Sequence, residues 1–95
     1  MLKVGSDYCI TLVHIDDCEG CIIADKILRT AINTTSKHVD YTKMNMTKPN
    51  RRFLKSFNIT DYPTILFMVK GVCKLKLTGS YPLAVIHRYM DIHFK

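Results

Sequence analysis

Hydrophobic and polar positions follow two alternating periods along this chain, and the alternation predicts strands and helices in turn. Tyr8 to Ile15 is a short, mostly apolar run rich in β-branched and aromatic residues, which is typical of a buried central strand. The next segment has helical spacing, which predicts a helix that begins near Cys18 and ends at an Asn33 C-cap. Its apolar face would consist of Ile23, Ala24, Ile27, Leu28, Ala31 and Ile32.

The middle of the chain predicts a second strand and a short second helix. His38 to Met46 alternates apolar and polar residues, which favours a strand. Pro49 suits the first turn of a helix, because its missing N–H has no partner within the helix at that position. We expect Phe53, Leu54 and Phe57 to dock this helix on a sheet.

The last third of the chain predicts a β-hairpin followed by a helix. Thr64 to Lys70 and Cys73 to Thr78 read as strands, and Gly71 between them is a turn signal. A turn this short makes the two strands antiparallel. The final helix would start near Pro82 and present one apolar face made of Leu83, Ile86, Met90 and Phe94.

The predicted order β-α-β-α-β-β-α is that of an α/β fold with a four-stranded mixed sheet and helices on both faces. The first two strands are joined through a helix, so they should be parallel and right-handed, with the hairpin beside them. The chain has no internal repeat or linker, and its 95 residues are one domain's worth of sequence. We therefore expect a single domain over residues 1–95.

Composition excludes several classes of protein but does not alter the predicted fold. The chain is 47% hydrophobic and 23% charged, as ordinary globular proteins are. Its net charge of +6 would suit nucleic acid, but only Arg51 and Arg52 are adjacent, so solubility or acidic partners explain the charge better. The apolar runs are too short to span a bilayer, and the first residues lack a signal-peptide layout. We expect a monomeric cytoplasmic protein that binds neither membrane nor nucleic acid.

Four cysteines are too few for a disulfide-stapled scaffold, and one pair has close spacing. Cys18 and Cys21 form a C-x-x-C motif, which in a cytosolic protein points to redox chemistry. Zinc is an alternative, but no second close pair is present, and we expect His14 to point into packing. An inert structural pair is another alternative. Cys9 and Cys73 lie in predicted inner strands, so we expect free, buried thiols.

The position of the motif matters more than its spacing. Cys18 would open a helix, where unpaired N–H groups and the helix dipole stabilise a thiolate. Cys21 would lie on the same helical face, largely covered, and could resolve a mixed disulfide. Asp16, Asp17 and Glu19 crowd this helix start. They either favour the helix through its dipole or disfavour the thiolate through their like charge, and both readings stay open.

A second feature is the proline at the start of the third predicted strand. Proline cannot donate a hydrogen bond in a central strand and belongs at a strand's beginning. The Tyr62-Pro63 bond could be cis and present backbone groups to a bound peptide, or it could be an ordinary trans bond at a strand entry. The residues alone favour the ordinary trans bond.

Taken together, these motifs resemble the thioredoxin superfamily, in its small thioredoxin- and glutaredoxin-type dithiol oxidoreductases. The C-x-x-C follows the first strand, and about forty residues later come Tyr-Pro-Thr-Ile-Leu-Phe, then Lys-Gly, a return strand and a glycine before the last helix. The resemblance implies a thioredoxin-like fold with Cys18 as nucleophile, Cys21 as resolving cysteine and a cis Pro63 facing them. Tyr62, Pro63 and Thr64 would hold the substrate.

The resemblance also implies partners and cofactors. The substrates would be disulfide-bonded proteins, and a reductase or thiol pool would recycle the cysteine pair. No metal or organic cofactor would be needed beyond the redox-active disulfide itself. The alternative is a thioredoxin-fold module kept for binding a partner, independently of redox chemistry, because a fold does not fix a function.

Overall fold

A computed structural model describes residues 6–47 and 51–94 of the chain, and the predicted order of elements is confirmed. The elements are β1 (Tyr8–His14), α1 (Glu19–Thr34), β2 (Val39–Asn45), α2 (Arg51–Phe57), β3 (Thr64–Val69), β4 (Val72–Thr78) and α3 (Leu83–His93). The predicted roles of Pro49 and of the Phe53 and Leu54 side chains lie outside what the structure describes.

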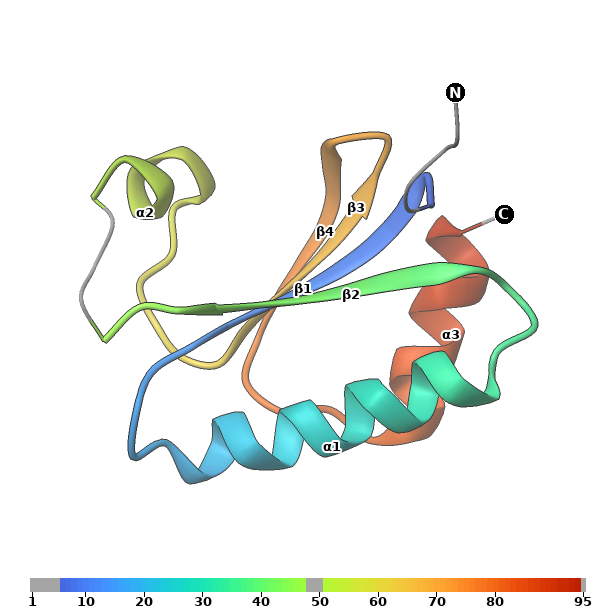
Figure 1. Cartoon of the computed structure of the whole chain (residues 1–95), viewed down its shortest axis with the longest axis horizontal. Helices are drawn as coiled ribbons and strands as arrows, with labels where there is room; N and C mark the ends of the chain where they lie inside the picture. Colours follow the sequence, from blue (N-terminus) through green and yellow to red (C-terminus); the bar gives the residue numbers. More distant parts are fainter. Residues whose placement is uncertain (1–5, 48–50, 95) are drawn as a thin grey trace.

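The four strands form one mixed sheet in the order β2-β1-β3-β4 (Figure 1). β1 and β2 are parallel, as expected for strands joined through a helix, whereas β3 is antiparallel to both β1 and β4. Lys70 and Gly71 connect β3 to β4 with φ of 50° and 81°. Positive φ at both central residues is the requirement of a type I′ hairpin turn, which glycine meets without strain.

One face of the sheet carries the larger core. Ile10 on β1 lies opposite Tyr41 on one side and Phe67 on the other, so these side chains share this face. Helices α1 and α3 pack against it and against each other (Figure 1). The fully buried residues of this core include Ile10, Leu12, Ala24, Leu28, Ala31, Phe67, Ile86, Met90 and Phe94.

The opposite face carries a smaller core near α2. Val13 and Leu66 point to this side and pack with Ile59, Met46 and partly buried Phe57 at the end of α2. Helices therefore cover both faces of the sheet, as predicted. Strand β2 serves both cores, because its apolar residues switch from one face to the other along its length.

Two details of α1 differ from the sequence prediction. The helix continues to Thr34 and is capped by Thr35, whose N–H donates to Ala31 O at 3.1 Å, so Asn33 is not the C-cap. The chain leaves the helix in an extended conformation, so no left-handed cap residue is needed. Ala24, Leu28 and Ala31 of the predicted face are buried, and Ile27 and Ile32 pack against the core, but Ile23 is 48% exposed and Cys21 is buried instead.

Candidate active site

Cys18 and Cys21 form a disulfide at the N-terminus of α1, with their Cα atoms 5.2 Å apart. Cys18 is the N-cap residue in extended conformation, and its Sγ accepts a hydrogen bond from Cys21 N at 3.1 Å. Cys18 is half-buried, whereas Cys21 is 4% exposed and packs inward. Cys18 is therefore the more accessible of the two cysteines, as the helix geometry predicted.

The helix terminus suits a negatively charged sulfur. The first N–H groups of a helix have no partner within it, and the summed peptide dipoles place partial positive charge there. α1 is 16 residues long, and its cap is the Cys18 sulfur itself. In the reduced protein a Cys18 thiolate at this position would accept a charge-assisted hydrogen bond from the backbone.

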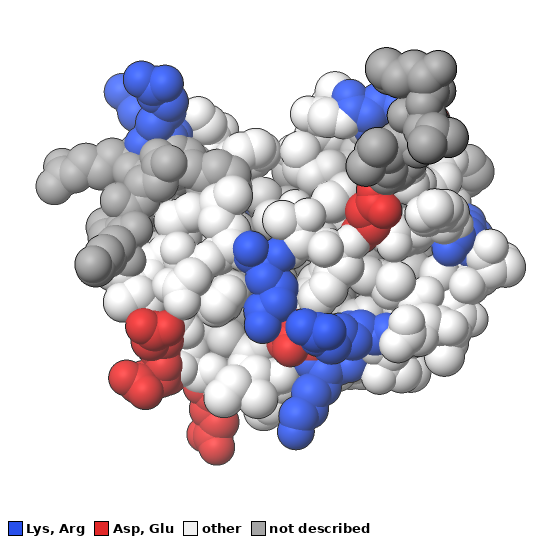
Figure 2. Space-filling model, in the orientation of Figure 1, with Lys and Arg blue, Asp and Glu red and all other residues white. Residues whose placement is uncertain are grey.

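The three predicted tuning carboxylates surround this terminus and are all exposed. Figure 2 shows acidic side chains gathered at the lower left, over the start of α1. Asp16 Oδ1 accepts a hydrogen bond from Asn45 Nδ2 at 2.9 Å, which ties the loop to β2. Asp17 has a φ of 56°, a left-handed conformation that aspartate tolerates better than most residues. Glu19 occupies the first turn of α1, where its charge favours the helix.

Pro63 lies directly beside the cysteine motif. The Tyr62–Pro63 peptide bond is cis. A Cβ added to Gly20, between the two cysteines, would stand 3.5 Å from Pro63 Cδ and 3.8 Å from Ser80 Oγ. Ser80 Oγ also donates to Gly20 O at 3.1 Å, and Gly79 N donates to Pro63 O at 2.8 Å. The motif, the proline and the loop before α3 thus meet at one seam.

The other two predicted substrate residues are differently placed. Tyr62 is half-buried and packs against the smaller core. Thr64 is 1% exposed, and its hydroxyl donates to Asp61 O at 2.7 Å. The Thr64 side chain is therefore turned into the protein, and Pro63 is the member of this segment that adjoins Gly20.

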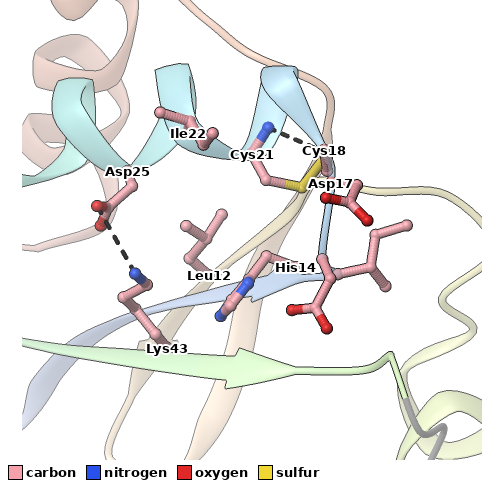
Figure 3. Close-up of a pocket in the computed structure, with 10 residues that line it drawn as sticks. Leu12, His14, Asp17, Cys18, Cys21, Ile22, Asp25 and Lys43 are labelled. Carbon is pink, nitrogen blue, oxygen red and sulfur yellow. Dashed lines mark hydrogen bonds and ion pairs between the residues drawn. A yellow bond between two sulfur atoms is a disulfide. The ribbon is translucent and has the colours of Figure 1, made fainter.

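Beside the disulfide lies a hollow of about 270 Å³ between the start of α1 and the strands β1 and β2 (Figure 3). Both cysteines line it, and Leu12 and His14 of β1 reach into it. The expectation that His14 points into packing is wrong: it is half-buried and faces the hollow. His14 is the last residue of β1, and it lies past the larger core that α1 and α3 form with the sheet.

Sequence reasoning missed a polar cluster that closes the far side of this hollow. Asp25, four residues after Cys21, accepts hydrogen bonds from Tyr41 Oη at 2.7 Å and Arg29 Nε at 3.0 Å. Lys43 Nζ lies 3.7 Å from Asp25 Oδ2. Burial alone would raise the pKa of Asp25, but these partners hold it below its usual value. Burial and the bond to Asp25 raise the pKa of Tyr41.

The helical spacing of Cys21 and Asp25 is the signal that could have revealed this cluster. Residues four apart lie on neighbouring positions of one helix face. The partner on β2, Lys43, lies opposite Leu12 of β1 in the sheet register. That register is not visible in the periodicity of either strand, so sequence reasoning could not place Lys43 beside Asp25.

The remaining cysteines, Cys9 and Cys73, are free, as predicted, but they are half-buried rather than buried, and Cys73 lies in the edge strand β4 rather than in an inner strand. Both lie across from Met68 of β3, from opposite sides. They therefore share the sheet face of the smaller core, whose buried members lie toward the other end of the strands. Cys9 has Thr11 and Thr42 within 4 Å of its sulfur, a polar surrounding that leaves it partly open.

Two features of residues 6–47 and 51–94 bear on other functions. No group of three or more histidine, cysteine, aspartate or glutamate side chains is placed there to hold a metal ion. Nor does this part of the chain contain a helix with the length and apolar character needed to cross a membrane.

Comparisons with known proteins agree on the fold. The sequence matches no protein-family model and no curated protein. Among solved structures, a point mutant of Halobacterium salinarum thioredoxin superposes with a TM-score of 0.81 at 13% identity, covering 94% of this chain and 76% of that one. Thioredoxin-2 of the malaria parasite, described as a component of its protein secretion machinery, gives 0.79 at 13% identity, covering 90% and 82%. Chloroplastic thioredoxin z gives 0.76 at 19%, covering 92% and 78%. The chain therefore has a thioredoxin-like fold.

Proposed function

We propose that this thioredoxin-like protein is a thiol–disulfide oxidoreductase that reduces disulfide bonds of other proteins through Cys18 and Cys21. One observation carries the proposal. An accessible sulfur caps a helix and accepts a backbone hydrogen bond, and a covered sulfur lies within bonding reach of it. This arrangement supplies both an attacking thiolate and a resolving thiol.

The reaction transfers two electrons in two exchange steps. The Cys18 thiolate of the reduced protein attacks one sulfur of a substrate disulfide; that bond breaks, and the other substrate sulfur leaves as a thiolate. Cys21 then loses its proton and attacks Cys18 Sγ, which releases the second substrate thiolate. The substrate has gained two electrons, and the protein retains the Cys18–Cys21 disulfide seen in the structure.

The surroundings of Cys18 supply the docking surface. The seam between Gly20 and Pro63 borders the motif on one side, and an exposed side chain, Ile22, lines the hollow on the other. We place the substrate chain along Tyr62, Pro63 and Thr64, as the resemblance implied. The negative charge of the carboxylates at the start of α1 would destabilise the Cys18 thiolate. A less stable reduced state would make the reduction potential of the Cys18–Cys21 pair more negative.

The proposed setting follows from this chemistry. A reductase or a thiol pool would return the pair to its reduced state, and the electrons need no metal or organic carrier because the cysteines store them. The protein would act as a monomer in the cytoplasm, where thiol pools are reducing.

Reduction of a small disulfide-bonded protein by dithiothreitol, followed by light scattering of the released chains, tests the proposal. The wild type should accelerate the reaction, and Cys18→Ser should abolish the acceleration. Cys21→Ser should accumulate a mixed disulfide with the substrate, detectable by mass. Cys73→Ser is the matched control and should retain the wild-type rate. Full activity of the Cys18→Ser variant would instead favour a redox-independent binding module.

A further inference from the structure

His14 is a titratable residue at the cysteine pair to which the exchange reaction above assigns no role. It projects from the end of β1 into the hollow that Cys18 and Cys21 line (Figure 3). Within the described residues its imidazole has no hydrogen-bond or ion-pair partner, and no buried side-chain nitrogen there lacks one. The ring nitrogens therefore contact solvent in the hollow, where they are free to exchange protons.

A proton acceptor in the hollow would assist the second exchange step. Cys21 is 4% exposed, and a thiol in apolar surroundings resists ionisation. Its proton must leave before the sulfur can attack Cys18, and bulk water reaches a covered sulfur poorly. Leu12, which also lines the hollow, has no atom that could accept the proton.

Asp25, four residues after Cys21 on α1, is another candidate acceptor among the carboxylates that line the hollow, and its contacts argue against it. Tyr41, Arg29 and Lys43 all donate to it or pair with it. They stabilise its charged form and hold its pKa below the usual value. A carboxylate stabilised in this way is a weak proton acceptor near neutral pH.

We propose that His14 accepts the Cys21 proton across this hollow during resolution and returns it to the departing substrate thiolate. The inference rests on the proposed function, since it concerns the second of its two steps. Neutral imidazole takes the proton from Cys21 Sγ, the Cys21–Cys18 bond forms, and the Cys18–substrate bond breaks. The imidazolium then protonates the released sulfur, so protons and electrons balance. Histidine suits this task because imidazole both gains and loses protons near neutral pH.

The charged groups around His14 come from three elements. Asp16 and Asp17 lie in the loop after β1 and line the same hollow. Lys43 lies on β2 and is paired with Asp25 of α1.

A single-turnover reaction with a dinitrobenzoate disulfide reagent separates the two steps. Attack by Cys18 releases one coloured aromatic thiolate, and resolution by Cys21 releases the second. His14→Gln should leave the first phase within about twofold and slow the second phase about 10- to 100-fold at pH 7, since positioned acid–base groups contribute at this scale. The pH dependence of the second phase should move from the imidazole range to the thiol range.

Controls distinguish this role from a structural one. His38→Gln changes an exposed histidine immediately before β2 and should alter neither phase. His14→Ala should regain part of the second-phase rate when imidazole is added to the buffer. Equal slowing of both phases, or an unchanged second phase and pH profile in His14→Gln, would overturn the role of His14. A wild type that shows no second phase would overturn the exchange function as well.

Discussion

Replacing Gly20 by alanine should stabilise the protein while impairing its reaction with protein substrates. Gly20 lies in the first turn of α1, and its helical backbone suits alanine without strain. The added Cβ would meet Pro63 Cδ at 3.5 Å and Ser80 Oγ at 3.8 Å, which are ordinary van der Waals separations. The methyl group therefore fits the seam between the motif and Pro63 without displacing either side.

The size of the effect follows from chain entropy and helix propensity. Glycine-to-alanine changes at compatible positions stabilise by about 0.4–1 kcal/mol, chiefly because the unfolded chain has fewer conformations. In a domain of this size, that free energy raises the melting temperature by about 2–8 °C. The same methyl group narrows the place where a substrate backbone would approach Cys18, so kcat/KM for a protein disulfide should fall severalfold. The small aromatic disulfide should react at the wild-type rate.

Thermal melting of the oxidised protein, together with both activity assays, measures these effects. Gly79→Ala serves as a contrast: Gly79 has a φ of 99°, so the variant should lose about 1–2 kcal/mol although no atom lies within 4 Å of the added Cβ. A Gly20→Ala protein that melts below the wild type would show that the seam is tighter than the distances indicate. Unimpaired reduction of the protein disulfide would remove the Pro63 seam from the substrate path.

Further predictions concern stability and the other cysteines. Leu28→Ala, at a fully buried position, should destabilise the protein by about 2–5 kcal/mol in a denaturant titration, and a smaller loss would mean that the core collapses around the cavity. The pKa of Asp25 in the folded protein lies below its ordinary value of 3.8, so its contribution to stability is present above that pH and lost as the pH falls through the folded pKa. Asp25→Asn should therefore reduce the loss of stability at acid pH. Asp17→Gly should raise the melting temperature by relieving a φ of 56°, and a lower melting temperature would contradict this. Thiol counting on the native oxidised protein should find two reactive, half-exposed groups, Cys9 and Cys73, and a second disulfide would refute that count.

The sequence predicted the fold well because its strongest signals are local. The run from Tyr8 and the hairpin at Gly71 mark strands to within about a residue, since periodicity and turn chemistry depend on neighbouring positions. The end of α1 was missed because a helix can leave through an extended residue such as Thr35 as readily as through a left-handed cap.

The site was only partly predictable, for a different physical reason. The cysteine pair is visible because its chemistry needs a fixed spacing on one helix. The direction of the His14 side chain was predicted wrongly, because the alternation of apolar and polar residues along a strand does not show where the helix that covers the strand ends. The exposure of Cys73 was misjudged because β4 is an edge strand, and that of Cys9 because the central position of β1 does not reveal whether both faces of the strand are covered. Each of these errors concerns how separate elements pack in space.

Equilibration of the protein with glutathione buffers of graded reduction potential tests the central claim most directly. Acid quenching, alkylation and mass measurement would count reduced Cys18 and Cys21 at each potential. A reductant should show one two-electron transition of this pair near the reducing end of the family, about −270 mV as in thioredoxin. A transition near −120 mV, as in a strongly oxidising disulfide-forming enzyme, would contradict the role of reductant, and the absence of any transition would contradict thiol–disulfide exchange itself.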